Sequence, residues 1–289
     1  MRLRLLYNPA AGRGRAKAHV REAEDILRAG GATVETQASA SPEDMTKLAA
    51  ESSRGGYDRV VVCGGDGSLN LALREFDLER GTLALVPLGS GDDFAKVMGI
   101  PRSVADACNV VLNGTVREVD VALANNRRYL GVAGFGFDSE VARFANENAK
   151  HLRGSAVYLY GILRVLPSFV PHHVKMDGKR ELEIMFAAVG NSRQYGGGIR
   201  ITPDAKIDDG LLDLCIVHKT SRMQLLKTLP LAYSGKHVRN AFVEMRRATE
   251  FSFKSDRDLD VYADGERITT TPVKFELAER KLRFVASRA

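Results

Sequence analysis

Four short apolar segments alternate with helical patterns over about the first 115 residues, and this alternation is the strongest constraint on the fold. The segments span residues 3–7, 32–37, 59–63 and 82–86, and each runs into a loop that leads to a helical pattern. Strands that alternate with helices in this way are typical of a parallel sheet covered by helices. We therefore predict an α/β protein with an N-terminal, Rossmann-like parallel α/β domain over residues 1–118.

The pattern changes after Gly114 to alternating apolar and polar residues, in runs joined by turn pairs such as Asn125-Asn126 and Asp264-Gly265. Such pairs favour tight hairpins between antiparallel strands. Two helical patterns interrupt the strands, at about 138–168 and 221–233. We predict a C-terminal, mostly antiparallel β-sandwich domain over residues 119–278. A last strand within 279–289 is expected to return to the first domain.

The composition is that of a folded protein with a small basic excess. Of 289 residues, 44% are hydrophobic, and 42 Lys and Arg stand against 36 Asp and Glu, which gives a net charge of +6. These values exclude a disordered chain. A small positive net charge suits binding to phosphates or to an anionic membrane surface, and it does not decide between the two. We expect no nucleic-acid partner, infer no protein partner, and leave a homodimer open.

Cysteine usage and hydropathy give expectations about the compartment. The three cysteines show no CxxC spacing, so we expect neither a disulfide framework nor a zinc site. The most apolar later stretch, residues 157–170, is interrupted by Arg164 and Pro167 and falls short of the roughly 20 residues that a spanning helix needs. We find no signal-peptide pattern. The expectation is a cytoplasmic protein that associates at most with a membrane surface.

The sharpest functional signal is VVVCGGDGSLN at residues 60–70, in which an apolar strand pattern runs through glycines directly into a helical pattern. Glycines let backbone N–H groups approach a phosphate, and a helix N-terminus adds free donors and partial positive charge. Ser68 adds a hydroxyl and Asn70 an amide. Asp66 would repel phosphates unless it orients a hydroxyl or lies beside a cation, so it favours catalysis over binding alone.

An alternative explanation is a tight turn in which Asp66 caps its own helix. The P-loop pattern GxxxxGK[ST] is absent, and Gly12-Arg13-Gly14 lacks the third glycine of a dinucleotide-binding loop. A P-loop NTPase and an NAD dehydrogenase are therefore both disfavoured.

A second glycine loop, LVPLGSGDDFAK at residues 85–96, follows the next strand. Ser90 lies between two glycines, and Asp92-Asp93 open a helix, where carboxylates suit the helix dipole. A glycine loop with acidic capping of that helix is an alternative explanation of this loop taken alone. Because open α/β sheets bind ligands at the carboxyl ends of their strands, the two loops together favour a phosphate site.

The first loop, YNPAAGRGRAK, places three cations near a helix start, where they oppose the dipole. Arg13, Arg15 and Lys17 would therefore suit a bound anion. Solvated basic side chains explain the same pattern.

These motifs together resemble the diacylglycerol kinase catalytic-domain family, which includes bacterial soluble lipid kinases and the sphingosine and ceramide kinases. The resemblance rests on NPAAGRG, GGDGSLN and PLGSGDDFAK, followed by DDGLLDL at 208–214 and YADGE at 262–266. It covers nearly the whole chain, with the motifs in family order. It implies ATP-dependent phosphoryl transfer to a lipid hydroxyl, on a fold shared with NAD kinases.

The resemblance also implies roles for particular residues. The nucleotide-binding residues that it implies are Gly64, Gly65, Asp66, Gly67, Ser68, Leu69, Asn70, Ser90, Ser39 and Asn8. Glu266, in the DGE turn, falls at the family's proton acceptor, and Asp66 would help to orient the reacting groups. The Mg²⁺ site would comprise the Asp209 carboxylate and the backbone carbonyls of Lys206 and Leu211.

The chain departs from the family pattern at two positions. Ser68 replaces the usual Thr and keeps its hydroxyl, whereas Asp92 replaces an uncharged Asn and adds a negative charge near the phosphates. From the residues alone, a hairpin turn is the favoured explanation of Glu266, whereas Asp209 is explained equally well as part of a turn. The glycine-rich run at 131–138 is assigned to strand packing. Residues 191–200 are assigned to a flexible loop, with a role in lipid or phosphate binding as the alternative.

We predict a lipid kinase that uses ATP and Mg²⁺, with its active site in the cleft between the two domains and a lipid substrate reached by peripheral membrane contact. One alternative is a kinase of a soluble substrate, such as an NAD kinase or a phosphofructokinase-like enzyme. Another is a nucleotide- or lipid-binding protein without turnover. The sequence leaves the lipid itself undetermined.

Overall fold

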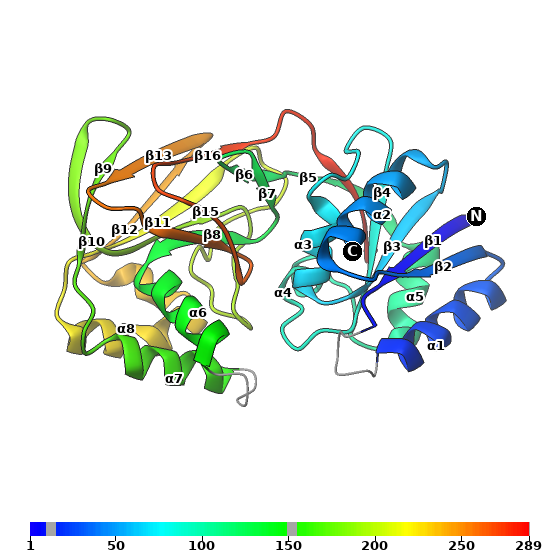
Figure 1. Cartoon of the computed structure of the whole chain (residues 1–289), viewed down its shortest axis with the longest axis horizontal. Helices are drawn as coiled ribbons and strands as arrows, with labels where there is room; N and C mark the ends of the chain where they lie inside the picture. The colour runs from blue at the N-terminus through cyan, green and yellow to red at the C-terminus, as the bar shows by residue number, and fades with distance from the viewer. Residues whose placement is uncertain (10–15, 149–154, 289) are drawn as a thin grey trace. The chain divides into compact units, whose positions relative to one another are not determined.

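The computed structural model describes residues 1–9, 16–148 and 155–288 (Figure 1). These residues divide into two compact units, of which unit 1 comprises Met1–Val121 with Glu279–Ala289 and unit 2 comprises Ala122–Ala278. Both agree in type with the sequence prediction, because unit 1 is a mainly parallel α/β fold and unit 2 is mainly antiparallel. Among the described residues there is no helix whose length and apolar character would let it pass through a bilayer.

Six strands of the described chain form the sheet of unit 1, in the order β2-β1-β3-β4-β17-β5. In chain order they are β1 (Arg2–Tyr7), β2 (Thr33–Ala38), β3 (Arg59–Gly64), β4 (Thr82–Pro87), β5 (Thr115–Val119) and β17 (Leu282–Ala286). The first four are parallel, whereas β5 pairs antiparallel with β17. The last strand of the chain thus lies inside the sheet of the first unit.

Helices cover both faces of this sheet, as the right-handed connection between parallel strands requires. The helices are α1 (Ala16–Ala29), α2 (Pro42–Arg54), α3 (Asp66–Leu73), α4 (Asp93–Val97) and α5 (Val104–Asn113). Helix α1 packs against α5, and α2 packs against α3. Ser41 caps α2 by accepting the N–H of Asp44, and Pro42 is its first residue.

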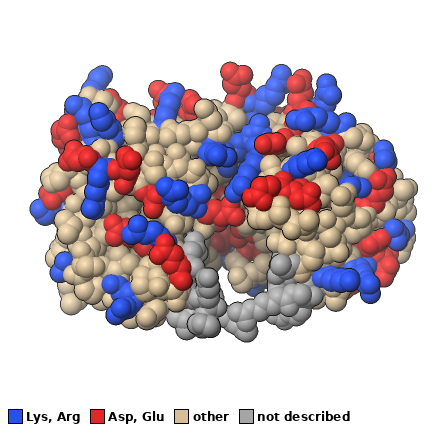
Figure 2. Space-filling model, in the orientation of Figure 1, with Lys and Arg blue, Asp and Glu red and all other residues tan. Residues whose placement is uncertain are grey.

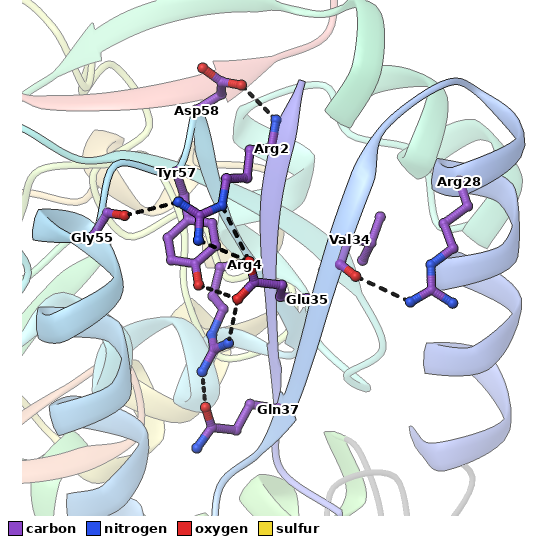
Figure 3. Close-up of polar contacts among 9 residues, drawn as sticks. All are labelled: Arg2, Arg4, Arg28, Val34, Glu35, Gln37, Gly55, Tyr57 and Asp58. Carbon is purple, nitrogen blue, oxygen red and sulfur yellow. Dashed lines mark hydrogen bonds and ion pairs between the residues drawn. The ribbon is translucent and has the colours of Figure 1, made fainter.

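A polar network fastens the edge strand β2 to β1 (Figure 3). Glu35 of β2 accepts hydrogen bonds from Arg2 at 2.9 Å and from the Tyr57 hydroxyl at 2.5 Å. The guanidinium of Arg2 lies over the Tyr57 ring, 4.4 Å from its centroid, and Arg4 bonds both Glu35 and Gln37. The bonds from Tyr57 and Arg2 hold the pKa of Glu35 below its usual range. This network stabilises the edge of the sheet that β2 forms.

Eleven strands of the described chain form the sheet of unit 2. They are β6 (Ala122–Ala124), β7 (Arg127–Tyr129), β8 (Val132–Gly136), β9 (His172–Met176), β10 (Arg180–Gly190), β11 (Leu212–His218), β12 (Val243–Ala248), β13 (Glu250–Ser255), β14 (Asp260–Ala263), β15 (Glu266–Thr270) and β16 (Val273–Leu277). Every pairing recorded between them is antiparallel.

This sheet curls over its own core. Strands β8 and β13 are three steps apart in the strand order, which is about 14 Å in a flat sheet. The rings of Phe135 and Phe253 on these two strands are nevertheless 5.0 Å apart. Alternate residues of nearly all strands point into this core. The curled sheet accounts for the sandwich character predicted from the alternating pattern.

Three helices cover the outer face of the same sheet: α6 (Phe137–Asn148), α7 (Ser155–Val165) and α8 (Arg222–Tyr233). Their inner sides pack with sheet residues into a second apolar cluster. The predicted turn pairs adopt left-handed backbone, with φ of 45° and 67° at Asn125 and Asn126 and of 49° and 89° at Asp264 and Gly265. The positions of the tight hairpins were therefore predicted correctly from the sequence.

Candidate active site

The carboxyl ends of four neighbouring strands carry the residues that were predicted to bind the nucleotide. Tyr7 pairs with Ala38 and Cys63, and Gly64 pairs with Pro87, so β1, β2, β3 and β4 end at one level. Directly after these ends follow the predicted residues: Asn8, Ser39, the segment 64–70, and Ser90. The structure thus brings the predicted nucleotide residues to one edge of the unit 1 sheet.

Their exposure at this edge differs. Ser39 is buried, and its hydroxyl donates to the Tyr7 carbonyl at 3.3 Å. Ser90 is exposed, Ser68 is half-buried and Asn70 is buried. Of these hydroxyls, those of Ser68 and Ser90 are therefore the more accessible to a ligand at this edge.

The turn from β3 into α3 presents backbone donors. Its N-cap is Gly65, which has no side chain to satisfy the first N–H groups of the helix. Those groups have no carbonyl partner within the helix. Asp66 is already inside the first turn, so the alternative explanation that it caps its own helix is wrong. A Cβ at Gly64 would lie 2.5 Å from the Ser68 hydroxyl, so glycine is required there.

Asp66 instead binds the start of the next helix. Its Oδ2 accepts the N–H of Asp93 at 3.0 Å, and its Oδ1 accepts the N–H of Phe94 at 3.1 Å. Burial raises the pKa of Asp66, and the two backbone hydrogen bonds oppose that shift. The carboxylate therefore connects the GGDGS loop to α4, which makes Asp66 a positioning residue in this structure.

Glycines let the same two loops touch. A Cβ at Gly65 would lie 2.9 Å from the Gly89 Cα, and a Cβ at Gly89 would lie 2.7 Å from the Gly65 Cα. The N–H of Leu88 also donates to the Gly64 carbonyl at 3.0 Å. Because any side chain at Gly65 or Gly89 would separate the loops, these two glycines are explained by packing as well as by phosphate approach.

The unusual Asp92 is buried beside these glycines. It is 2% exposed and adopts left-handed backbone with φ of 50°, a conformation that Asp and Asn tolerate better than most residues. Its carboxylate accepts the N–H of Gly89 at 3.0 Å and pairs with Arg102 at 3.4 Å. Burial and then the charge of Asp66 raise the pKa of Asp92. Its negative charge is thus partly neutralised within the protein.

The predicted basic loop is only partly described. Arg13 and Arg15 lie outside the described residues, and Lys17 is exposed near the start of α1.

Glu266 lies in unit 2, where it opens β15 opposite Ala263. The preceding turn is anchored, because the Asp264 carboxylate accepts the N–H groups of Gly131 at 3.1 Å and Val132 at 3.0 Å. A Cβ at Gly131 would lie 2.1 Å from Asp264 Oδ1. Asp264 and Gly131 thus fix the position of Glu266 at the start of β15.

Sequence reasoning missed Asp138 and Tyr195. Asp138 is in the first turn of α6, directly after β8, and its Oδ2 accepts the Tyr195 hydroxyl at 2.5 Å. Burial raises the pKa of Asp138 from 3.8 to about 6, although the bond from Tyr195 opposes the shift. Such a carboxyl is a functional-site candidate. The available signal was a glycine-rich strand running into an acid at a helix start, the pattern recognised at residues 60–70.

The loop with Tyr195 is tied to the same region rather than free in solvent. The Asn191 N–H donates to the Gly131 carbonyl at 2.9 Å, and the Asn191 amide donates to Leu130. Asn191 is fully buried. The prediction of a flexible loop over 191–200 is therefore wrong at its start. Gly131 links this loop to the turn before Glu266.

The magnesium site predicted at Asp209, Lys206 and Leu211 stays a prediction, and the Asp209 carboxylate has partners within the protein. Asp209 Oδ1 accepts the Leu211 N–H at 3.1 Å, and its Oδ2 bonds the Arg247 guanidinium, which also pairs with buried Asp213 at 3.2 Å. Lys206 is exposed. Mg²⁺ prefers an octahedron of oxygens, whereas this carboxylate already has a cation. Within the described residues, no cluster of three or more acids, histidines or cysteines could hold a metal.

Comparisons with known proteins identify the family of the chain. The family model for the diacylglycerol kinase catalytic domain matches residues 2–124, and that for the YegS C-terminal NAD kinase beta sandwich-like domain matches 131–286. A "Diacylglycerol kinase" of Bacillus subtilis (strain 168) is 29% identical over 95% of this chain and 92% of that protein. A "Probable lipid kinase YegS-like" of Chromohalobacter salexigens is 32% identical over 86% of this chain and 82% of that protein.

The fold also matches a crystal structure of a "putative diacylglycerol kinase" from Bacillus anthracis str. Sterne, with a TM-score of 0.85 and 27% identity over 99% of this chain and 95% of that one. The α/β unit with glycine loops at its strand ends matches the catalytic-domain model, and the curled antiparallel unit matches the C-terminal model, which together with the curated relatives places the chain among the lipid kinases. The chain belongs to the diacylglycerol kinase family. This confirms the resemblance found in the sequence, and with it the prediction of an enzyme.

Proposed function

We propose that the protein transfers the γ-phosphoryl group of ATP to the hydroxyl of diacylglycerol or a related lipid. The observation that carries this proposal is the arrangement of the predicted nucleotide residues at one edge of the unit 1 sheet. Helix α3 begins at this edge with N–H groups that have no partner inside the helix. Such a helix start suits the phosphates of a nucleotide.

The protein's part in phosphoryl transfer is mainly to position and to stabilise charge. In this proposal the first-turn N–H groups of α3 and the hydroxyls of Ser68 and Ser90 bind phosphate oxygens. Asp66 acts through its bonds to α4, which hold the two loops together. Phosphoryl transfer generally uses a divalent cation bound to the nucleotide, so we expect Mg²⁺ to be required with ATP. A resident ion at Asp209 is not part of the proposal.

Unit 2 offers two candidates for the group that accepts the proton of the lipid hydroxyl. Glu266 is implied by family resemblance, and its strand start is fixed by the anchored Asp264 turn. Asp138 is favoured by its chemistry, because a pKa of about 6 suits a base that works near neutral pH. The transfer rate as a function of pH separates the two candidates. If Asp138 is the base, the rate falls as the pH drops below about 6, and Asp138→Asn abolishes this dependence.

Peripheral contact with the cytoplasmic membrane surface follows if the acceptor is a membrane lipid. We expect that contact to weaken with salt, given the net charge of +6.

The test is a transfer assay with γ-³²P-labelled ATP and a total lipid extract, with the phosphorylated lipid identified by mass spectrometry. The expected result is labelled lipid that depends on a divalent cation. Asp66→Ala should lower kcat, because the two loops lose their shared carboxylate. Asp256→Ala, at an exposed aspartate of unit 2, is the control. Preferential labelling of NAD or a sugar phosphate, or ATP binding without transfer to any lipid, would contradict the proposal.

A further inference from the structure

The outer side of α7 is apolar, whereas the solvent side of a helix in a globular protein is ordinarily polar. Leu159 and Leu163, one turn apart, are 56% and 55% exposed, and Tyr160 beside them is 40% exposed. The inner side of the helix is well anchored, because Val165 is buried in the cluster beneath the helices. Helix α7 is thus held in place while it leaves an apolar stripe in water.

Helix α8 and the segment after α7 expose further apolar side chains. Met223 is 59% exposed, Leu231 is 38% exposed and Tyr233 is 47% exposed, and Val170 is exposed by 63%. Few large apolar residues elsewhere in the described chain are so exposed, Val116 of β5 being one. Apolar exposure therefore concentrates on these two helices.

The two helices present these residues on one side of unit 2. Leu225 of α8 and Val165 of α7 lie in the same apolar cluster. The Arg222 side chain donates to the Phe169 carbonyl at 3.4 Å, which joins the start of α8 to the segment after α7. Because both helices cover the same face of the sheet, their outer sides point away from it together (Figure 1). We call this surface the α7–α8 face: Leu159, Tyr160, Leu163, Arg164, Val170, Arg222, Met223, Lys227, Leu231 and Tyr233.

The charges of the α7–α8 face are all positive. Neither helix contains an Asp or Glu, although the chain has 36 of them. Arg164, Arg222 and Lys227 are exposed among the apolar residues. Figure 2 shows mainly tan with isolated blue where Figure 1 places α7 and α8, whereas both signs mix above them. Apolar side chains interspersed with cations are typical of helices that lie on anionic membranes.

We propose that the α7–α8 face docks on the surface of an anionic phospholipid bilayer. The inference rests on the proposed function, in which the acceptor is a membrane lipid. Helix α7 packs against α6, whose first turn carries Asp138, so docking brings the helix of a candidate proton acceptor to the source of the lipid. A second copy of the chain fits less well, because it would bring the cations of two such faces together.

The test is co-sedimentation of the full chain with vesicles of equal parts phosphatidylglycerol and phosphatidylcholine, compared with phosphatidylcholine alone. Wild type should bind the anionic vesicles and dissociate as salt rises. Leu159→Ser/Leu163→Ser should lower the partition constant by about tenfold or more, because two half-exposed leucines lose their contact with the lipid. Arg164→Ala/Lys227→Ala should remove most of the preference for anionic vesicles.

Two matched variants control for general effects. Val116→Ser changes an apolar residue that is 48% exposed in unit 1, and Lys254→Ala removes an exposed cation of unit 2. Neither should change vesicle binding. Equal binding by wild type and the Leu159→Ser/Leu163→Ser variant would overturn the inference. The inference would also be overturned if wild type were a dimer and the Leu159→Ser/Leu163→Ser variant a monomer, because a second copy of the chain would then cover the α7–α8 face.

Activity on a short-chain diacylglycerol dispersed below its aggregation concentration separates this inference from the proposed function. The Leu159→Ser/Leu163→Ser variant should phosphorylate the dispersed lipid like wild type and lose turnover only on vesicles. An equal loss on both substrates would overturn the docking role. Vesicle binding that depends on these leucines, in a protein that phosphorylates no lipid, would support the docking face and contradict the kinase proposal.

Discussion

Replacing Asp138 by Asn should stabilise the protein at pH 8 while it impairs turnover. The pKa of Asp138 rises from 3.8 to about 6 on folding, a shift of about two units. At about 1.4 kcal/mol per unit, ionised Asp138 lowers the free energy of unfolding at pH 8 by at most about 3 kcal/mol. Asn carries no charge, and its side-chain oxygen can accept the bond that the Tyr195 hydroxyl makes to Asp138.

The sign of the pH dependence follows from proton binding. Between about pH 4 and pH 6 folded Asp138 holds a proton that the unfolded chain has released, so this residue's contribution to stability falls as the pH rises. Below that window both states are protonated, and above it both are ionised, so the contribution is then constant. The difference between Asp138→Asn and wild type should therefore be near zero at about pH 4 and reach its maximum above about pH 7.

Calorimetric unfolding from pH 4 to pH 8 measures this difference. For a unit of this size, about 1 kcal/mol shifts Tm by about 2–4 °C, so the variant should gain at most about 12 °C at pH 8. Asp256→Asn, which changes the same atoms at an exposed position of unit 2, should show no such trend. Parallel Tm profiles for wild type and Asp138→Asn, or a variant less stable at pH 8, would refute the reasoning.

Three further substitutions test other contacts of the site. Asp92→Asn should lower the KM for ATP by about threefold to tenfold, because it keeps the bond from Gly89 and removes a charge near the phosphates; an unchanged KM would show that Arg102 already neutralises it. Gly131→Ala should lower kcat and cost about 1–3 kcal/mol of unfolding free energy in denaturant titrations, because its Cβ would displace Asp264; wild-type kcat would contradict the anchoring role. Arg247→Ala should lower Tm, because Asp213 loses its partner, and added Mg²⁺ should restore part of the loss; full stability without Mg²⁺ would contradict this.

Much of the fold could be predicted because its signals are local. The strand segments, the cap at Ser41 and the turns at Asn125-Asn126 and Asp264-Gly265 each depend on a few adjacent residues. The gathering of the predicted nucleotide-binding residues at one edge of the unit 1 sheet followed from the rule that ligands bind at the carboxyl ends of parallel strands. The curling of the second sheet was harder, because the contact between Phe135 and Phe253 joins strands far apart in sequence.

The roles of Asp66 and Asp138 could not be predicted, because their partners are also distant in sequence. Asp66 finds its donors at Asp93 and Phe94, on a loop that only the sheet brings near. The pKa of Asp138 depends on burial and on Tyr195, which is 57 residues away. Pattern analysis identifies which residue types are present, whereas their chemistry depends on neighbours that are distant in sequence.

The place of β17 has a consequence for the order in which the protein folds during synthesis. Strand β17 lies between β4 and β5, and β5 pairs with no other strand in the described chain. The ribosome therefore releases all the strands of unit 2 before the sheet of unit 1 can close. Until residues 282–286 emerge, β4 has an open edge, which is a site for aggregation. In a chain truncated before residue 282, unit 1, which carries the nucleotide loops, should therefore be the unit that does not fold.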